Sequence, residues 1–572
     1  MKRHFRGDYY VVGEGVLAYD DPRAPVDKRS PTCHRPSTTE QLRKFRFSRL
    51  GPRGEQVSVE LLKAIATAMT VDVSNPDSRP DATIPAGFTY LAQFIDHDLT
   101  LDKTAVEFGE DITVAELLQG RSPALDLDSL YGRGPNHSRD EKFYASDGIR
   151  LKTGRAVGPP LGDRDGFDLP RTGVGSTQAE RRAPLIPDPR NDENLAVAQT
   201  HLAFIRFHNQ VVDRLAETGT PSALLFNKAR KEVVRHYQWL TRTDFLPRVV
   251  NPAIVDDVFT NGRRYFEVAA PPDDPYREGY TQPGDYPTMP IEFAVAAYRL
   301  GHSMVRGAYQ WNRIFNSAGP LGIATLLQLF TFTGLNGNFT PGSTIAELDD
   351  PNSGAALQLP TIWLADFQRL YDFTEAGRAD LTPADGQLNV TKRIDTLLVN
   401  PLGELPAGSF GGRGTNPPAD QRNLAFRNLV RANMVNLASG QQMAEKLGVT
   451  PLKDDDIING NGGASLAGLS DDQKSSLLTS TPLLFYILRE AELNDGRLDG
   501  VGGRVVAEVF HRSIEGSRNS TLREPGWRPW LGPDENTFRM VDLLLVAYEG
   551  SKELLNPLGD AQPEPPAPPP QP

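Results

Sequence analysis

The spacing of apolar residues along the chain predicts a mainly α-helical protein. Apolar positions recur every three or four residues, the period of one face of an α-helix, in several separate segments. Segments that alternate apolar and polar residues are few, and no repeat of fixed length is present. The predicted helices cover residues 57–69, 87–101, 188–217, 222–240, 291–306, 323–329, 424–435, 440–447, 482–494 and 502–514.

The segments between these helices are long and irregular. Residues 120–190 are rich in Gly, Pro, Asp and Arg, which is typical of a functional or surface-wrapping loop, and residues 251–288 read as a proline-rich connection. We therefore predict one large helical domain with little β structure over residues 86–554. Residues 1–85 would form an arm packed on this domain. Residues 555–572 would form a proline-rich, disordered tail.

The segment from Tyr90 to Thr100 combines apolar residues with a cluster of polar ones. On a helix, Gln93 and His97 share one face, because they are four residues apart, and Asp96 lies beside them. Asp98 points away from this face, since each residue turns the helix by about 100°. Apolar residues spread around the helix and leave no solvent-facing stripe. Burying three ionisable groups there without partners would be costly, so the segment predicts a functional site rather than a solvated helix.

Composition limits the classes of function. The chain has 572 residues, 39% hydrophobic and 23% charged, as in soluble globular proteins. Its net charge of −12 argues against a nucleic-acid partner, and no run of about 20 apolar residues predicts a membrane span. Cys33 is the single cysteine, which excludes an internal disulfide framework and a thiolate metal cluster. The basic start has no apolar core after it, so no standard secretory signal is expected.

Two of the nine histidines lie in largely apolar helical segments. His97 is one and His302 is the other, with Arg299 three residues before it. Either alone is more often a hydrogen-bonded core histidine. Two helices that each offer an imidazole to one cavity suggest a sandwiched cofactor. Haem is the obvious candidate, with one histidine as axial ligand and the other free for acid–base chemistry.

Five segments, in order, resemble those of the animal-type haem peroxidases, the peroxidase–cyclooxygenase superfamily, in the style of its bacterial members. They are the segment of the distal histidine (Gln93 to Thr100), the calcium loop (Ser122 to Gly132), the segment of the distal arginine (Asp188 to Glu193), the helix of the proximal histidine (Glu292 to His302) and the segment of the supporting asparagine (Asn428 to Arg431). The resemblance implies a large helical catalytic domain.

The resemblance also implies catalytic roles. His97 would move the proton of hydrogen peroxide, Arg190 would stabilise the charge that develops as the O–O bond breaks, and Gln93 would hold a water or a halide. His302 would be the proximal iron ligand and Asn428 would accept its other ring N–H. Arg299 could pair with a haem propionate.

The resemblance extends to covalent links and to a second metal. Asp96 and Glu193 match positions that form ester links to haem. Asn194 stands where members with a third, sulfonium link carry Met, so that link should be absent. A calcium ion would be bound by Asp98 together with the side chains of Ser122, Asp126 and Asp128 and the carbonyl of Ala124. These loop carboxylates could instead be solvated.

The expected function is reduction of hydrogen peroxide, through an oxo-ferryl state, with oxidation of halides, pseudohalides or small organic donors such as phenols. Such an activity belongs to the response to oxidative stress.

Two alternatives remain. The superfamily contains fatty-acid dioxygenases, but their radical tyrosine lies three residues before the proximal histidine, where this chain has Arg299; Tyr298 is one residue off. A calcium-held binding or adhesion module without catalysis is the other. The compartment stays open between an exported protein, secreted or periplasmic, and a cytoplasmic one.

Overall fold

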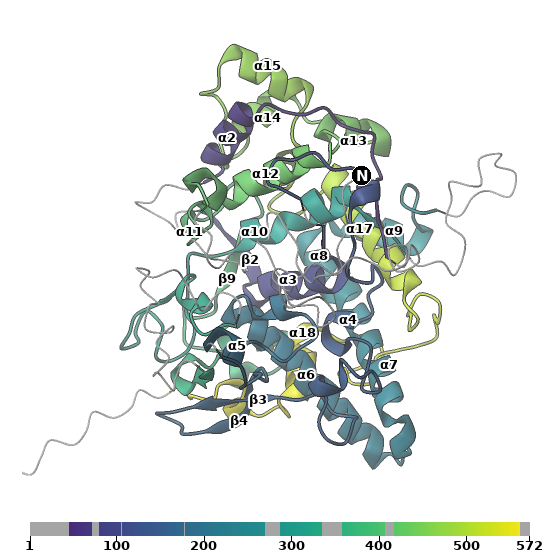
Figure 1. The fold of residues 1–572 in the computed structure, drawn as a ribbon, viewed down its shortest axis with the longest axis vertical. Helices are drawn as coiled ribbons and strands as arrows, with labels where there is room; N and C mark the ends of the chain where they lie inside the picture. Colours follow the sequence, from purple (N-terminus) through teal and green to yellow (C-terminus); the bar gives the residue numbers. More distant parts are fainter. Residues whose placement is uncertain are drawn as a thin grey trace, which may run out of the picture.

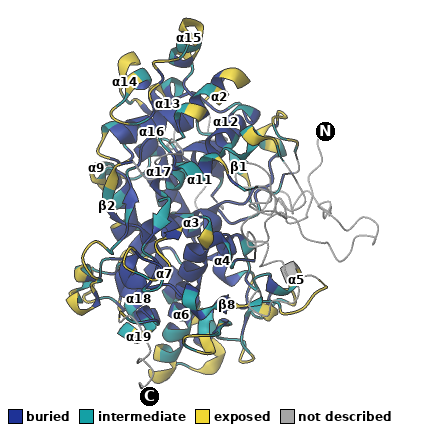
Figure 2. Ribbon diagram, turned by 90° about the vertical axis from the view of Figure 1, so that its left-hand side faces the viewer, coloured by how far each residue is buried: buried dark blue, intermediate teal, exposed yellow. Residues whose placement is uncertain are grey.

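A computed structural model describes the chain over residues 45–70, 79–104, 106–176, 178–268, 287–334, 357–406 and 417–560. Helix α3 (Gly87–Leu99) lies near the middle of the molecule. Above it lie α12 (Leu424–Met434) and α17 (Gly500–Gly516) in Figures 1 and 2, and α16 (Leu483–Leu493) in Figure 2. Below it lie α6 (Leu195–Glu217) and α18 (Met540–Ala547). Twelve of the thirteen residues of α3 are buried, so the helix is the centre of the core.

The remaining helices surround this core. The α-helices are α2 (Val59–Ala68), α4 (Asp128–Tyr131), α5 (Gln178–Arg182), α7 (Ser222–Leu240), α8 (Leu246–Val249), α9 (Pro252–Asn261), α10 (Gly301–Met304), α11 (Asn400–Gly403), α13 (Gly440–Leu447), α14 (Asp454–Asn459), α15 (Asp471–Thr479) and α19 (Lys552–Leu555). Short 3₁₀ turns are η2 (Val114–Glu116), η3 (Glu141–Phe143), η4 (Pro189–Asp192), η8 (Ala297–Leu300), η9 (Gln328–Phe330), η12 (Thr361–Trp363), η13 (Phe367–Arg369), η14 (Phe373–Ala376), η15 (Ala379–Leu381) and η17 (Ala419–Arg422). Two π-helical turns are η5 (Thr241–Phe245) and η7 (Glu292–Ala296).

The strands are short and link distant segments. Antiparallel pairs join β2 (Asp81–Pro85) to β9 (Val390–Lys392), β3 (Gly154–Val157) to β4 (Arg164–Asp168), and β6 (Ala308–Tyr309) to β7 (Ala324–Thr325). Parallel pairs join β1 (Phe47–Ser48) to β5 (Met289–Pro290), and β3 to β8 (Leu359–Pro360). The prediction of a mainly helical fold with little β structure is confirmed. No helix in the described ranges is both long and apolar enough to cross a bilayer.

Two predicted helices are interrupted. The segment 188–217 begins at the cap Asp188 but forms the 3₁₀ turn η4 first, and α6 starts again with Asn194, whose side chain accepts the N–H of Val197. The segment 291–306 is three pieces, η7, η8 and α10, because Ala296 leaves the helical region with φ −130° and ψ −73°. Arg299 lies in the 3₁₀ turn η8 and His302 in the α-helix α10 that follows it directly, so the two residues are not part of one regular helix.

Two further predictions are wrong. Residues 323–329 contain β7 and η9 instead of a helix, and Ile323 is 40% exposed, so its apolar residues do not form one buried stripe. The proline-rich connection 251–288 contains α9, in which Pro252 occupies the first turn and Asn251 caps it. Proline is compatible with that position, because the first N–H has no partner within the helix.

The carboxylate of Glu292 joins the segment before α2 to the helical part of the chain. It accepts the backbone N–H groups of Leu50 and Gly51, both at 2.9 Å, and β1 pairs with β5 next to it. Residues 1–44 and the end of the predicted tail, 561–572, lie outside the described residues. The division into arm, catalytic domain and tail stays a prediction.

Candidate functional site

His97 is enclosed by the core and bound to Asn191 of η4. The side chain is 4% exposed, and its Nδ1 lies 2.8 Å from Oδ1 of Asn191. Because an amide oxygen only accepts hydrogen bonds, this contact places the ring proton on Nδ1. Burial, reinforced by the positive charge of Arg190, lowers the pKa of His97 to about 3. The ring is therefore neutral at neutral pH, and its Nε2 has a free lone pair.

The side chain of Arg190, a residue of η4, contacts the backbone of α3. Its Nη2 donates to the carbonyl of His97 at 2.9 Å and to the carboxylate of Asp188 at 2.7 Å. Arg121 also donates to Asp188, through its Nε at 2.8 Å. Burial alone would raise the pKa of Asp188, but the guanidinium groups of Arg121 and Arg190 outweigh it and lower that pKa below its ordinary value. Asp188 therefore stays ionised and keeps both cations beside α3.

Gln93, Glu193 and Asn194 form a second contact between α3 and the start of α6. The amide nitrogen of Gln93 donates to Oε2 of Glu193 at 2.9 Å, and its oxygen accepts from the Asn194 amide at 3.0 Å. Nε2 of His97 is 3.9 Å from Oε1 of Glu193. The predicted face of Gln93 and His97 therefore meets one segment, residues 190–194.

His302 is the second histidine of the predicted site and lies on α10, which packs against α3. It is partly exposed, and its Nδ1 lies 3.0 Å from the amide nitrogen of Asn428 on α12. Burial, with Arg299, lowers its pKa to about 3, so the ring is neutral, the form that binds a metal. With the amide nitrogen facing the ring, the ring proton sits on Nε2. Iron ligation through Nε2 requires the Asn428 amide to turn by 180°, so that its oxygen accepts from Nδ1.

One contact brings the two histidine segments together. Arg299, three residues before His302, has its Nη1 3.5 Å from Oδ2 of Asp96, the residue before His97. Helices α3 and α10 also pack directly against each other. Burial raises the pKa of Asp96 to about 7, although Arg190 acts in the opposite direction. The carboxylate predicted at the haem edge and the cation predicted at a propionate are therefore neighbours.

Asp98 faces away from His97, as the helical spacing predicts. Its carboxylate accepts the backbone N–H groups of Leu127 at 3.1 Å and Ser129 at 3.3 Å, and the Ser129 hydroxyl at 3.1 Å. Burial and the nearby charge of Asp128 raise the pKa of Asp98 well above its ordinary value. Asp98 therefore joins α3 to the loop predicted to bind calcium.

The rest of the predicted calcium set is only partly assembled. Asp128 accepts the N–H of Ser122 through Oδ2 at 3.1 Å, and its buried Oδ1 has no hydrogen-bond partner. Ser122 accepts the N–H of Ala124 at 3.2 Å, whereas Asp126 accepts the hydroxyl of Ser517. No group of three or more His, Cys, Asp and Glu side chains in the described ranges is close enough to hold a metal ion. The calcium site stays a prediction.

Asn191 and His201 belong to this site, although the sequence patterns did not single them out. The amide nitrogen of Asn191 donates to Nδ1 of His201 on α6 at 2.9 Å, and both side chains are fully buried. A hint lies in the sequence: Asn191 follows Arg190 directly in a segment assigned to the site. The contact with His97, 94 positions away, has no local signal.

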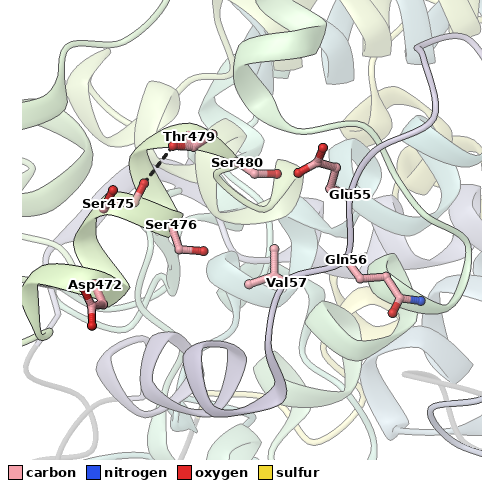
Figure 3. A pocket seen from close by; sticks show the side chains of 8 residues that line it. All are labelled: Glu55, Gln56, Val57, Asp472, Ser475, Ser476, Thr479 and Ser480. Carbon is pink, nitrogen blue, oxygen red and sulfur yellow. Dashed lines mark hydrogen bonds between the residues drawn. The ribbon is translucent and has the colours of Figure 1, made fainter.

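A separate pocket of about 330 Å³ lies between residues 55–57 and α15 (Figure 3). Its lining is mainly polar and contains none of the predicted site residues: Glu55, Gln56, Val57, Asp472, Ser475, Ser476, Thr479 and Ser480. The pocket is unrelated to the two histidine segments.

Comparison with known proteins finds similarity to haem peroxidases. Residues 103–324 match the family described as animal haem peroxidase. Chorion peroxidase of Drosophila melanogaster is 28% identical over 196 residues, which cover 32% of this chain and 21% of that protein. Thyroid peroxidase of Rattus norvegicus is 28% identical over 199 residues, which cover 33% of this chain and 19% of that protein. Over part of its length, this chain is similar to the animal haem peroxidases.

The similarity to the animal haem peroxidases has definite bounds. The chain spans about a fifth of the length of these two relatives. The matched residues include Arg190 and His302 and leave His97 and Asn428 outside. Peroxidase A of Dictyostelium discoideum shares the fold, with a TM-score of 0.53 and 16% identity, over 87% of this chain and 95% of that chain. The family implies haem, whereas the ester links, the calcium ion and a place among bacterial members stay predictions.

The residues present fit a haem group. A neutral imidazole on α10 is the donor that haem iron takes in peroxidases. A second neutral imidazole lies on the helix that packs against α10, with Arg190 beside it. The one mismatch is the amide of Asn428, and rotation about a single side-chain torsion removes it.

Proposed function

We propose that this chain is a haem peroxidase that reduces hydrogen peroxide and oxidises halides, pseudohalides or small organic donors. The contact between Arg299 and Asp96 carries this proposal, because it brings the segment of His302 against the helix of His97. The neutral ring of His97, whose backbone carbonyl accepts a hydrogen bond from Arg190, supports the proposal further.

On the distal side, His97 would act as base and then as acid. Its Nε2 takes the proton from the near oxygen of hydrogen peroxide and returns it to the departing oxygen as water forms. Arg190 stabilises the negative charge that develops on that oxygen. Gln93, whose amide is bound at both ends, would orient a water molecule or a halide above His97. Haem supplies the iron that takes up the two oxidising equivalents of peroxide and passes them to the donor.

On the proximal side, His302 would bind the iron through Nε2. The Asn428 oxygen accepts the N–H of Nδ1 and so orients the ring. An amide does this without a full charge, so we expect His302 to be a less electron-rich ligand than a histidine paired with a carboxylate.

Three further assignments follow from the resemblance. Asp96 and Glu193 would form ester links to haem, and the raised pKa of Asp96 agrees with a carboxyl that is not held as a charge. Arg299, which contacts Asp96 in this structure, would instead pair with a haem propionate. A calcium ion would be bound by Asp98, Asp126, Asp128, Ser122 and the carbonyl of Ala124. The unpartnered Oδ1 of Asp128 supports such an ion.

The fatty-acid dioxygenase remains the second candidate. The hydroxyl of Tyr298 is buried without a hydrogen-bond partner, which would suit a redox-active tyrosine. Its ring, however, stacks on Phe293 at 4.7 Å and packs edge-on against Phe510 at 5.3 Å, as in an ordinary core tyrosine. The peroxidase is therefore favoured.

Substrate oxidation by the haem-reconstituted chain separates these functions. The peroxidase predicts oxidation of iodide or a phenol that depends on hydrogen peroxide. Oxygen uptake with an unsaturated fatty acid and no peroxide would favour the dioxygenase. Absence of both reactions in a haem-loaded protein would favour a non-catalytic module. Acid–acetone extraction of the same sample tests the ester links, because linked haem stays with the protein.

A further inference from the structure

Asn191 connects three elements around His97. Its oxygen lies 2.8 Å from Nδ1 of His97 on α3, and its amide nitrogen lies 2.9 Å from Nδ1 of His201 on α6. Both histidines and the amide are almost completely removed from solvent. The next residue in the chain toward the N-terminus, Arg190, bonds the carbonyl of His97. Two consecutive residues therefore hold both the backbone and the ring of His97.

The chemistry at position 191 admits few side chains. An amide offers one acceptor and two donors, so it can accept from one imidazole and donate to the other. A carboxylate would still accept from His97 but could not donate to His201. An aliphatic side chain could do neither. In the observed orientation the amide nitrogen donates to Nδ1 of His201 while the amide oxygen faces His97, so His201 supports this orientation of the amide when its own ring proton is on Nε2. The ring of Phe94 on α3 packs edge-on against His201 at 5.6 Å and stacks on Phe204 at 4.4 Å, which fixes the second imidazole.

We propose that Asn191, oriented by His201, is a positioning residue that holds the His97 ring proton on Nδ1 and keeps Nε2 open toward peroxide. In the opposite tautomer Nε2 would carry the proton and could not accept another, so the first proton transfer would stop. This inference rests on the proposed function for its kinetic consequence. The tautomer itself depends on the contacts of the His97 ring: the Asn191 oxygen 2.8 Å from Nδ1, which favours a proton there, outweighs the Glu193 carboxylate, which lies 3.9 Å from Nε2.

The tautomer can be measured without haem. Solid-state ¹⁵N spectra of the full-length chain, labelled at histidine and compared with His97→Gln, identify the two ring nitrogens of His97. We expect the proton on Nδ1 in the wild type and in Asn191→Asp, which keeps the acceptor. In Asn191→Leu both tautomers should appear. A wild-type spectrum with the proton on Nε2 would overturn the inference.

The kinetic arm uses the haem-reconstituted chain at pH 8. Removing a group that orients a catalytic imidazole typically costs about 10- to 100-fold, so we expect that loss in the rate with hydrogen peroxide for Asn191→Leu. Asn191→Asp should recover most of the rate, and His201→Phe should lose less than Asn191→Leu. Rescue by Asp distinguishes ring positioning from a packing role, since a purely structural amide would not be replaced by a charge.

A matched control keeps the two proposals apart. Asn209 lies on α6, and its side chain makes two hydrogen bonds to the backbone of Leu151, at 2.9 and 3.0 Å. Asn209→Leu should lower stability and leave both the tautomer and the rate unchanged. If the wild type reacts with peroxide and Asn191→Leu reacts equally fast, the inference fails. If the haem-loaded wild type does not react, the proposed function fails, and the ¹⁵N spectrum still decides the tautomer.

Discussion

His97 and His302 lie in two helices that pack against each other but are of different kinds. His97 belongs to a regular helix of 13 residues and is bound through its ring to Asn191 and through its carbonyl to Arg190. His302 belongs to α10, a four-residue helix after a π turn and a 3₁₀ turn, and its ring is bound by Asn428. The His97 ring already has the amide oxygen that the proposed mechanism requires, whereas the proposed role of His302 requires the Asn428 amide to be reversed.

This contrast predicts different results for the two histidines. If the proposed function holds, His302→Ala should abolish haem retention and with it peroxidase activity, because it removes the proposed iron ligand. The measurement is the Soret absorbance of the haem-reconstituted protein, at roughly 400 nm for histidine-ligated haem, relative to total protein. His137→Ala, at a partly exposed position, should bind haem as the wild type does. Unchanged haem retention in His302→Ala would contradict the assignment.

Substitution on the distal side should spare haem and remove catalysis. His97→Gln leaves no base at the peroxide, so the second-order rate with hydrogen peroxide should fall by about 10²- to 10⁴-fold. Haem content should stay within error of the wild type. Stopped-flow absorbance gives the rate. A His97→Gln protein that reacts at the wild-type rate would show that another group moves the proton.

The pair of guanidinium groups around Asp188 predicts a pH-dependent stability. The folded-state pKa of this carboxyl is depressed below its unfolded value of about 3.9, so its stabilisation is present above that pH and is lost as pH falls. Asp188→Asn leaves two buried cations without their anion and should cost about 3–5 kcal/mol at pH 7. Denaturant midpoints at pH 7 and pH 3.5 should show a smaller difference at the lower pH.

An exposed carboxylate provides the control for this effect. Asp165 pairs with Arg155 on the surface, where solvent screens the pair, so Asp165→Asn should change the midpoint far less. An equal effect of the two substitutions would contradict the role assigned to the buried cluster.

The smallest of these effects is expected at the proximal amide. Asn428→Leu removes the partner of His302 Nδ1 and should weaken haem binding or activity by about 10- to 100-fold. Asn428→Gln, with a longer side chain, should recover part of the loss. Haem titration of the full-length chain measures the affinity. No change in either variant would mean that the ring of His302 is held by packing alone.

The central helix was predictable because its signal is local. The segment from Gly87 was predicted to reach residue 101 and ends at Leu99, and the separation of His97 from Asp98 follows from the helical angle alone. The same holds for α7 and α13, whose observed bounds equal the predicted ones. Periodicity suffices where one regular helix carries the pattern.

The breaks and the long-range contacts were not predictable in this way. The segment of His302 has the apolar content of a helix, and only the backbone at Ala296 shows that it divides. Asn191 contacts His97 from 94 positions away, and His201 approaches Asn191 only because Asn194 starts α6 after the turn η4. Side-chain contacts between separate elements depend on packing, which no spacing rule contains.

The most direct test of the account is one absorption experiment on the full-length chain. The purified protein is reconstituted with haem, its Soret band is recorded, and hydrogen peroxide is added to the wild type and to His97→Gln. The account predicts a Soret band in both proteins and a rapid peroxide-dependent shift in the wild type alone. No Soret band after reconstitution would contradict the convergence of His97, Arg190 and His302 on one haem.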